Sequence, residues 1–117
     1  MFVQIFSTGG TIDKIYYDAL SEFKIGEPMA GELLKDARVG FDYAIESLIK
    51  KDSLELDDAD RELIHARVVT CPAEHILITH GTDTMTVTAA ALADIDNKVI
   101  VLTGAMQPAR FRDSDAL

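Results

Sequence analysis

Three short apolar runs alternate with polar segments along the chain. The runs cover residues 2–6, His75–Thr79 and 98–104, and each has the length of a strand and is too short for a core helix. Each run ends at a small polar turn, and these turns read "TGGT", "HGTDT" and "TGAM" in chain order. The pattern predicts three buried strands that all finish in turns built from threonine and glycine.

Between these runs the apolar positions change to helical spacing. Residues 27–38 predict a short helix, with a proline near the start and Gly40 after the end, and the alanine-rich residues 84–94 predict another. A third helix follows Asp57 and Asp58, which supply a cap and negative charge at its amino end. We expect this helix to bury a stripe formed by Ala59, Leu63, Ala66 and either Val69 or Thr70.

Two further segments are less regular. Residues 41–49 alternate in a way that is compatible with a strand, although their apolar residues also fit one face of a helix, and we favour the strand. Residues 12–26 mix Tyr16, Tyr17 and Phe23 with charged residues and close at Gly26. This mixture is typical of a hairpin or flap rather than of a core element.

Strands that alternate with helices predict an α/β fold with a mainly parallel sheet covered on both faces. Ligands of such folds bind beyond the carboxyl ends of the strands, where all three threonine-glycine turns are expected. Gly9 and Gly10 would let the backbone approach a ligand and leave amide donors free, while Thr8 and Thr11 would offer hydroxyl groups. The alternative for this first turn is that its residues merely lead the chain out of a strand.

Composition and charge narrow the function classes. The chain has 117 residues, 48% of them apolar, which predicts one domain with an adequate core. Eleven basic against twenty acidic side chains give a net charge of −9, which disfavours nucleic acid and anionic membranes as partners. Because Cys71 is the single cysteine and no leader or membrane-length apolar run is present, we expect a cytoplasmic protein. His65, His75 and His80 lack ligand spacing, so we expect no metal and no other cofactor.

Three motifs together resemble one enzyme family. The segments "STGGTID", "ILITHGTDTM" and "VLTGAMQPARFRDSDA" are similar, in order and spacing, to the amino-terminal domain of the bacterial L-asparaginases and related glutaminases. The resemblance covers nearly the whole chain and implies a three-layer α/β/α fold. It also implies that Thr11 is the acyl-accepting nucleophile, that Thr82 and Asp83 belong to the catalytic and substrate-holding set, and that Ser53 contacts the carboxylate of the amino acid.

Hydrolysis of a side-chain amide needs a nucleophile, help with proton transfer and donors for the oxyanion. Thr82, beside a cationic group, would polarise a water or accept a proton through it, and Asp83 would bind the substrate's α-ammonium group. The oxyanion donors would be backbone amides of the glycine turns, namely Gly9 or Gly10, Gly81, and Ala105. We therefore expect an asparagine amidohydrolase that passes through an acyl-Thr11 ester, with L-asparagine or L-glutamine as substrate.

The chain also departs from that family. Larger relatives carry a lysine beyond the third strand that contacts the Thr-Asp pair, whereas the lysine after Asp83 here is Lys98, which we place at the opposite end of a strand. We expect no second domain within these 117 residues, and the family's flap tyrosine aligns with Phe23, although Tyr16 or Tyr17 could supply the phenol instead. The chain most resembles compact asparaginases without the second domain. Whether it is naturally short or part of a longer protein stays open.

Other residues and functions have plainer interpretations. We expect His80 to orient its loop rather than carry protons, and we expect Arg110 and Arg112 to be paired within their own loop rather than to bind a substrate carboxylate. An open sheet edge predicts a homo-oligomer. Two alternatives to an active asparaginase remain, a weakly catalytic amino-acid-binding or regulatory module of the same fold and a phosphate or nucleotide binder that uses a glycine turn.

Overall fold

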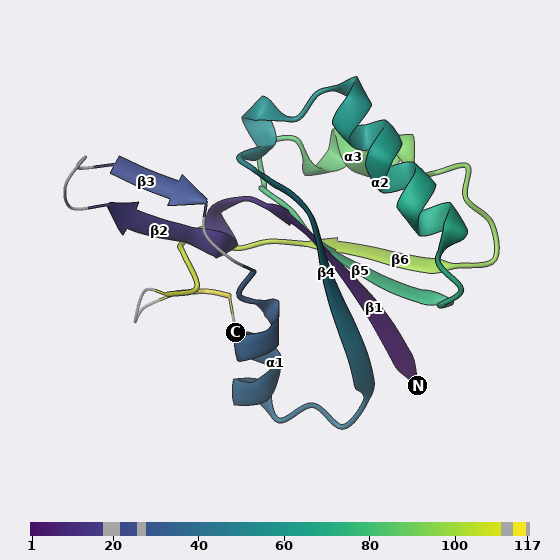
Figure 1. Cartoon of the computed structure of the whole chain (residues 1–117), viewed down its shortest axis with the longest axis horizontal. Coiled ribbons are helices and arrows are strands. Elements are labelled where there is room, and N and C mark those ends of the chain that lie inside the picture. The colour runs from purple at the N-terminus through teal and green to yellow at the C-terminus, as the bar shows by residue number, and fades with distance from the viewer. Residues whose placement is uncertain (18–21, 26–27, 111–113, 117) are drawn as a thin grey trace.

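The computed structural model describes residues 1–17, 22–25, 28–110 and 114–116. In this part of the chain, a parallel sheet with the strand order β4-β1-β5-β6 forms the centre of the molecule (Figure 1). The strands are β1 (Phe2–Gly9), β4 (Asp42–Lys51), β5 (His75–Thr79) and β6 (Val99–Thr103). The three predicted strands are therefore confirmed, and residues 41–49 form a strand rather than a helix.

The register of the sheet brings all carboxyl ends to one edge. In the middle of the sheet Ile5 lies beside Ile45 of β4 on one side and Leu77 of β5 on the other, and every pair of strands is parallel. At the end of β1 the pairing with β4 shifts register between Ser7 and Gly9. β1 then leaves the sheet directly at the "TGGT" turn, where the site was predicted.

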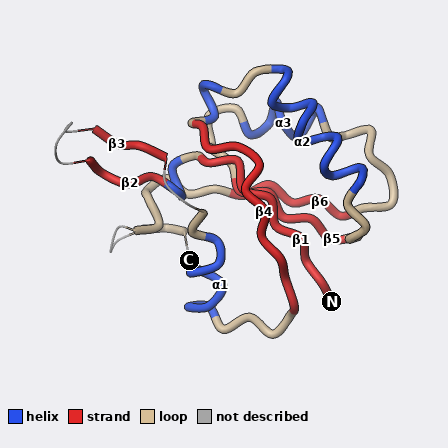
Figure 2. Tube along the Cα trace, viewed as in Figure 1, coloured by secondary structure: helices blue, strands red, loops and turns tan. Residues whose placement is uncertain are grey.

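Helices cover the two faces of this sheet. The connection through α1 (Ala30–Ala37) moves from β1 outward to β4, whereas those through α2 (Asp58–Thr70) and α3 (Met85–Ala91) move in the opposite direction. Because parallel crossovers are right-handed, opposite directions place the helices on opposite faces. Figure 2 shows α2 and α3 together on one side and α1 on the other, and Gly31 of α1 lies close to Ile45 of β4. The predicted three-layer α/β/α arrangement is thus confirmed.

The main core lies between the sheet and the α2–α3 layer. It is formed by fully or nearly buried side chains from both layers, namely Phe6, Ile49, Leu56, Ile64, Val68, Cys71, Ile76, Ile78 and Leu92. At its margin the Arg67 guanidinium lies 5.6 Å from the centre of the Phe6 ring and donates two hydrogen bonds of 2.9 Å to Glu46 of β4. This pairing lowers the pKa of Glu46, chiefly through the hydrogen bonds from Arg67.

The predicted buried stripe of the α2 helix is wrong. Leu63 and Val69 are 43% and 52% exposed, and Ala59 and Ala66 are also exposed, whereas Ile64 and Val68 are completely buried. The helix turns this face to the sheet because Ile64, Val68 and Cys71 follow one another at helical spacing and fill the core with bulkier side chains than the alanines could. Thr70 is exposed as well.

The ends of the helices follow local signals with small shifts. Asp57 caps α2 as predicted, and a reciprocal bond between the Asp60 side chain and the Asp57 amide completes a capping box. The α1 helix begins at Ala30, ends at Ala37 and is followed by Arg38 in the left-handed region at φ 54°. The α3 helix ends at Ala91 rather than Asp94. No helix in the described ranges is both long and apolar enough to cross a membrane.

The β6 strand was predicted to be buried, but it forms an edge of the sheet and is buried only in part. Ile100 and Leu102 pack on the core, whereas Val99 and Val101 are 57% and 50% exposed on the other face. The exposed face of β5 and β6 is hollowed into an apolar groove of about 220 Å³. Its lining includes Met1, Val3, His75, Leu77, Val99 and Val101.

The segment after the first turn forms the predicted hairpin. The strands β2 (Lys14–Tyr17) and β3 (Glu22–Ile25) pair in antiparallel fashion, with Lys14 beside Ile25, and project away from the main sheet (Figure 1). The candidate phenols of Tyr16 and Tyr17, and the Phe23 side chain aligned with the family tyrosine, lie outside the described side chains.

The corrected face of α2 gives a direct stability test. Ile64→Ala should lower the free energy of unfolding by about 2–5 kcal/mol because it leaves a cavity in the core. Leu63→Ala, the matched control on the next residue, should cost less than about 1 kcal/mol because that side chain is partly in water. Urea unfolding followed by circular dichroism measures both values, and an equal cost for the two substitutions would contradict the assigned face.

Candidate functional site

Four turns meet at the carboxyl edge of the sheet. They follow β1, β4, β5 and β6 and contain Gly10, Ser53, Gly81 and Gly104 in that order. The turns pack so closely that their glycines have no room for a side chain. A Cβ atom on any of Gly10, Gly81 or Gly104 would collide with a residue of a neighbouring turn. The chain segments predicted to form the site therefore lie side by side.

Gly10 and Gly81 are in direct backbone contact. A Cβ atom on Gly10 would lie 2.5 Å from the Gly81 nitrogen, and the φ of Gly10 is +84°, a conformation that side chains rarely adopt. The Gly10 amide donates to the Lys51 carbonyl at 3.0 Å, which ties the same turn to the end of β4. The "TGGT" turn is therefore more than an exit from a strand, because its second glycine is required by the neighbouring loop.

Ser53 lies beneath Gly81 and is fully buried. It begins the short helix η2 (Ser53–Glu55), and a Cβ atom on Gly81 would lie 2.7 Å from both the Ser53 Cβ and Oγ. Asp52 caps η2 by accepting the Ser53 amide at 3.0 Å. Within the described residues the Ser53 hydroxyl has no hydrogen-bond partner. A buried hydroxyl in this condition is costly unless a ligand or water satisfies it.

Thr11 opens the short helix η1 (Thr11–Asp13) immediately after Gly10 and is half-buried. A buried carboxylate, Asp13, holds this helix in place because its two oxygens accept hydrogen bonds from Ser7 Oγ at 3.0 Å and from the Met29 amide at 2.8 Å. Sequence reasoning missed Asp13. The available signal in the sequence was the position of this acidic residue directly after the apolar Ile12 in "TID".

Thr82 and Asp83 follow Gly81 and are exposed. The Thr82 hydroxyl makes a long contact of 3.8 Å with the Met106 sulfur, and Asp83 has no hydrogen-bond or ion-pair partner among the described residues. In the same part of the chain, no hydrogen bond links Thr11 to either residue. The structure therefore brings the backbones of the two motifs together. It leaves the side chains of Thr11, Thr82 and Asp83 available to a ligand.

The turn after β6 returns to the first motif. Ala105 is buried, and the next two amides, of Met106 and Gln107, donate to Asp115 at 3.0 Å, which lowers the pKa of that carboxyl group. Farther along, Arg110 donates to the Asp13 carbonyl at 2.9 Å. Arg110 therefore bonds the backbone of the first motif, whereas the sequence predicted a partner within its own loop, and Arg112 lies outside the described residues.

His80 is completely buried next to Gly81. Its Nδ1 lies 2.6 Å from the Gly81 carbonyl oxygen and its Nε2 lies 2.7 Å from the Thr88 hydroxyl, while its amide donates to Thr103 at 2.9 Å. Burial lowers the pKa of His80, and the positive charge of Arg61 lowers it further. The hydrogen bond to the Gly81 carbonyl raises this pKa but does not offset the lowering. A neutral imidazole is therefore favoured, consistent with a role in orienting the loop.

The lysine downstream of Asp83 does not reach the site. Lys98 donates to the Cys71 and Ala73 carbonyls at 2.6 and 2.7 Å, at the amino edge of the sheet, as predicted from its position before β6. A cation that the sequence analysis did not consider lies nearer, since Lys14 pairs with Asp52 at 3.1 Å, next to Ser53.

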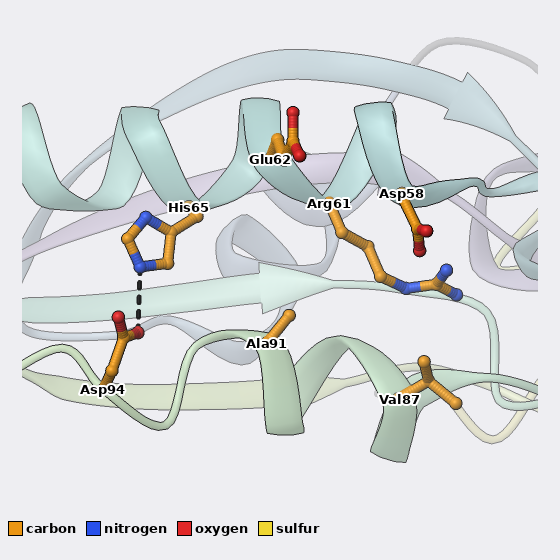
Figure 3. Close-up of a pocket in the computed structure, with 7 residues that line it drawn as sticks. All are labelled: Asp58, Arg61, Glu62, His65, Val87, Ala91 and Asp94. Atoms are coloured by element: carbon orange, nitrogen blue, oxygen red, sulfur yellow. Dashed lines mark hydrogen bonds and ion pairs between the residues drawn. The ribbon is translucent and has the colours of Figure 1, made fainter.

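A separate hollow of about 420 Å³ opens between α2 and α3 (Figure 3). Carboxylates of Asp58, Glu62 and Asp94 line it, together with Arg61 and His65. His65 contacts Asp94 across the hollow at 2.9 Å, as the dashed line in Figure 3 marks. The hollow is thus a polar groove between helices, and in Figure 3 the Arg61 side chain extends between α2 and α3 toward Asp58.

Comparison with known proteins gives a consistent result. The protein family described as "Asparaginase, N-terminal" matches residues 2–117. The chain is similar to the thermostable L-asparaginase from Thermococcus kodakarensis, with 27% identity, a TM-score of 0.81 and coverage of 98% of this chain and 37% of that one. Among curated protein sequences there is no significant match.

Two further solved structures are similar over almost the whole chain. A probable cytoplasmic L-asparaginase from Campylobacter jejuni has 29% identity and a TM-score of 0.77 over 97% of this chain and 35% of that one. L-asparaginase I from Vibrio cholerae has 27% identity and a TM-score of 0.81 over 97% of this chain and 37% of that one. The chain therefore spans little more than a third of the length of these proteins.

The contact between Gly10 and Gly81 can be tested by adding one methyl group. Gly10→Ala should destabilise the fold by roughly 3 kcal/mol or more, because the new Cβ meets backbone atoms and the φ is unfavourable. Gly40→Ala is the matched control, since no atom lies within 4 Å of the corresponding Cβ, and it should change stability by less than about 0.5 kcal/mol. Urea unfolding gives both values, and a neutral Gly10→Ala would refute the close approach.

Proposed function

The chain belongs to the asparaginase amino-terminal domain family, and from this premise we propose that it carries the nucleophile and the amino-acid-binding groups of an L-asparagine amidohydrolase. The observation that supports this most strongly is the contact between Gly10 and Gly81. It joins the turn that bears Thr11 to the turn that bears Thr82 and Asp83. Two of the three named structural neighbours are described as L-asparaginases and the third as a probable L-asparaginase.

In the proposed reaction the Thr11 oxygen attacks the side-chain amide carbon of asparagine. The Thr11 proton passes to the leaving nitrogen, the C–N bond breaks, and ammonia departs from an aspartyl ester on Thr11. Water then attacks the ester, the C–O bond breaks, and aspartate and the Thr11 hydroxyl are regenerated. The half-buried Thr11 suits this role because no hydrogen bond in the described structure occupies its hydroxyl.

The two charged ends of the amino acid would be held by different turns. Asp83 is exposed at the site and is available to pair with the α-ammonium group. Ser53 presents a buried hydroxyl that has no partner among the residues the structure describes, and a substrate carboxylate would satisfy it. Selectivity for an amino acid over a simple amide follows from these two contacts, and we propose asparagine as the substrate with glutamine as the competing one.

Backbone amides would stabilise the oxyanion. Gly81 and Ala105 lie in the converging turns, and short glycine turns let such donors approach a ligand closely. The Gly10 amide, expected from the sequence to be free, donates instead to the Lys51 carbonyl, so Gly10 contributes the close backbone approach and no oxyanion donor. Thr82 would act on the proton transfer through a bound water. Within the described part of the chain, its exposed hydroxyl makes only the long contact with the Met106 sulfur, so that it is available to a water or a substrate.

One observation favours a second candidate function, an amino-acid-binding or regulatory module with slow turnover. A threonine hydroxyl is a weak nucleophile without a base or cation to assist the proton transfer. The downstream Lys98 is bonded at the opposite edge of the sheet. The two functions share the binding contacts and differ in whether ammonia is released.

The nucleophile and the ammonium-binding residue can be tested separately. Thr11→Ala should reduce ammonia release from asparagine by about a thousandfold or more while asparagine still binds. Asp83→Asn should weaken asparagine binding by roughly tenfold or more because it removes the paired charge. Coupled ammonia assays and titration calorimetry on the same samples measure the two effects.

Thr86→Ala, on the exposed face of α3, is the matched control and should change neither quantity. Full ammonia release by folded Thr11→Ala would disprove the nucleophile, and unchanged affinity in Asp83→Asn would disprove the ammonium contact. Asparagine binding by the unmodified chain without any ammonia release would favour the module over the enzyme.

We also propose that the chain works in the cytoplasm as a homo-oligomer. The half-exposed Val99 and Val101 on the edge strand β6 support self-association, since such apolar edges are usually covered. Sedimentation velocity should reveal dimers or larger species, and Val101→Glu should shift them toward the monomer. A monomer at every concentration would contradict the proposal.

A further inference from the structure

We propose that Arg61 is a positioning residue that sets the two substrate-binding turns through one connected hydrogen-bond network with Thr88, Thr84 and His80. Its guanidinium lies on α2, outside the converging turns, and reaches the turn of Ser53 in one direction and the turn of Gly81 in the other. The inference rests on the proposed function only in that these turns are the ones assigned to the substrate.

The direction of each bond toward Gly81 follows from chemistry. A guanidinium group can only donate, so Thr88 Oγ1 must accept from Arg61 Nε at 3.1 Å. The Gly81 carbonyl can only accept, so His80 Nδ1 carries a proton, and in the neutral ring Nε2 accepts the Thr88 proton at 2.7 Å. A neutral His80 that accepts at Nε2 carries its proton on Nδ1, and this proton is donated to the Gly81 carbonyl at 2.6 Å. The network therefore requires a single tautomer of His80.

The second branch leads to Ser53. Arg61 Nη2 donates to Thr84 Oγ1 at 3.1 Å, and the Thr84 hydroxyl in turn donates to the Ser53 carbonyl at 2.9 Å. A third contact joins Arg61 Nη1 to the Leu56 carbonyl at 3.3 Å, just beyond the short helix η2. Hydrogen bonds thus link the Arg61 side chain to the turn of Ser53 and to the turn of Gly81, and these two turns are in contact with each other.

Because this network is buried, the loss of any one of its hydrogen bonds is costly. His80 and Thr88 have no exposed surface, so a broken bond would leave polar atoms without water. The cation itself lies at the groove between α2 and α3, which Asp58 and Glu62 also line (Figure 3). The carboxylates of this groove provide a favourable electrostatic environment for the guanidinium.

The consequence for the site lies in the peptide between Gly81 and Thr82. The carbonyl and the amide hydrogen of a trans peptide point in opposite directions. When His80 holds the Gly81 carbonyl toward the interior, the Thr82 amide is directed away from the interior. The backbone that continues to Asp83 then begins from a fixed orientation. A contact behind the loop can therefore determine where the loop presents its functional groups.

The test removes one hydroxyl from the middle of the network. Thr88→Val keeps the shape of the side chain, Thr88→Ser restores the hydroxyl, and Thr86→Val makes the same change on the exposed face of α3. In the unmodified chain, nitrogen NMR of the His80 ring should show a neutral imidazole with the proton on Nδ1. Thr88→Val should disturb this signature, and Thr88→Ser should restore it.

The effect on the site is measured on the same variants. In Thr88→Val and Arg61→Met, hydrogen exchange of the Thr82 and Asp83 amides should become about tenfold faster, and asparagine binding should weaken by about the same factor, which corresponds to one lost hydrogen bond. Ile64→Val, which weakens the neighbouring core without touching the network, should leave both quantities near their original values. This comparison separates positioning from general stability.

Three results would overturn the inference. They are a charged His80 or an Nε2 proton in the unmodified chain at neutral pH, unchanged loop exchange in Thr88→Val, and equal effects of Ile64→Val and Thr88→Val at matched stability. If the unmodified chain neither binds nor hydrolyses asparagine, the proposed function fails, whereas the ring tautomer and the loop exchange still decide whether Arg61 positions the turns.

Discussion

The close approach of Gly10 to the backbone of Gly81 is the constraint on which the rest of the site depends. Two strands of a parallel sheet deliver their turns to the same edge, but only residues without a Cβ atom let the turns touch. Ser53 then packs under Gly81, and Gly104 packs against His80 in the same way. The absence of side chains at these glycines is what allows the turns to form one surface.

Around this contact the interior is polar rather than apolar. Asp13, with Ser7 and Met29, holds the turn of Thr11, while His80, with Thr88 and Arg61, lies behind the turn of Thr82. Apolar packing alone would permit several loop conformations, whereas hydrogen bonds have direction and penalise the alternatives. Among the described residues, the proposed nucleophile Thr11 and the proposed ammonium ligand Asp83 have no hydrogen-bond partner for their side chains on this rigid support.

Local signals predicted most of the fold. Short apolar runs identified β1, β5 and β6, and the Asp57 cap located the start of α2 within one residue. The errors concern which face is buried. The stripe through Leu63 and Val69 proved exposed, and one face of β6 proved open, because burial depends on the neighbouring element and its position in the sheet. Strand order, which made β6 an edge, is not encoded in the strand itself.

The sequence by itself determined the class of fold and the threonine-glycine turns, since these depend on residue types at short spacing. The candidate roles of Thr11, Thr82 and Asp83 came from the family resemblance of those turns. Only the tertiary structure revealed Asp13, Arg61 and the orientation of His80. Arg61 and Thr88 are 27 residues apart, and Arg110 and Asp13 are 97 apart. No local pattern links such partners, because the hydrogen bonds between them exist only after the chain has brought four distant turns to one edge of the sheet.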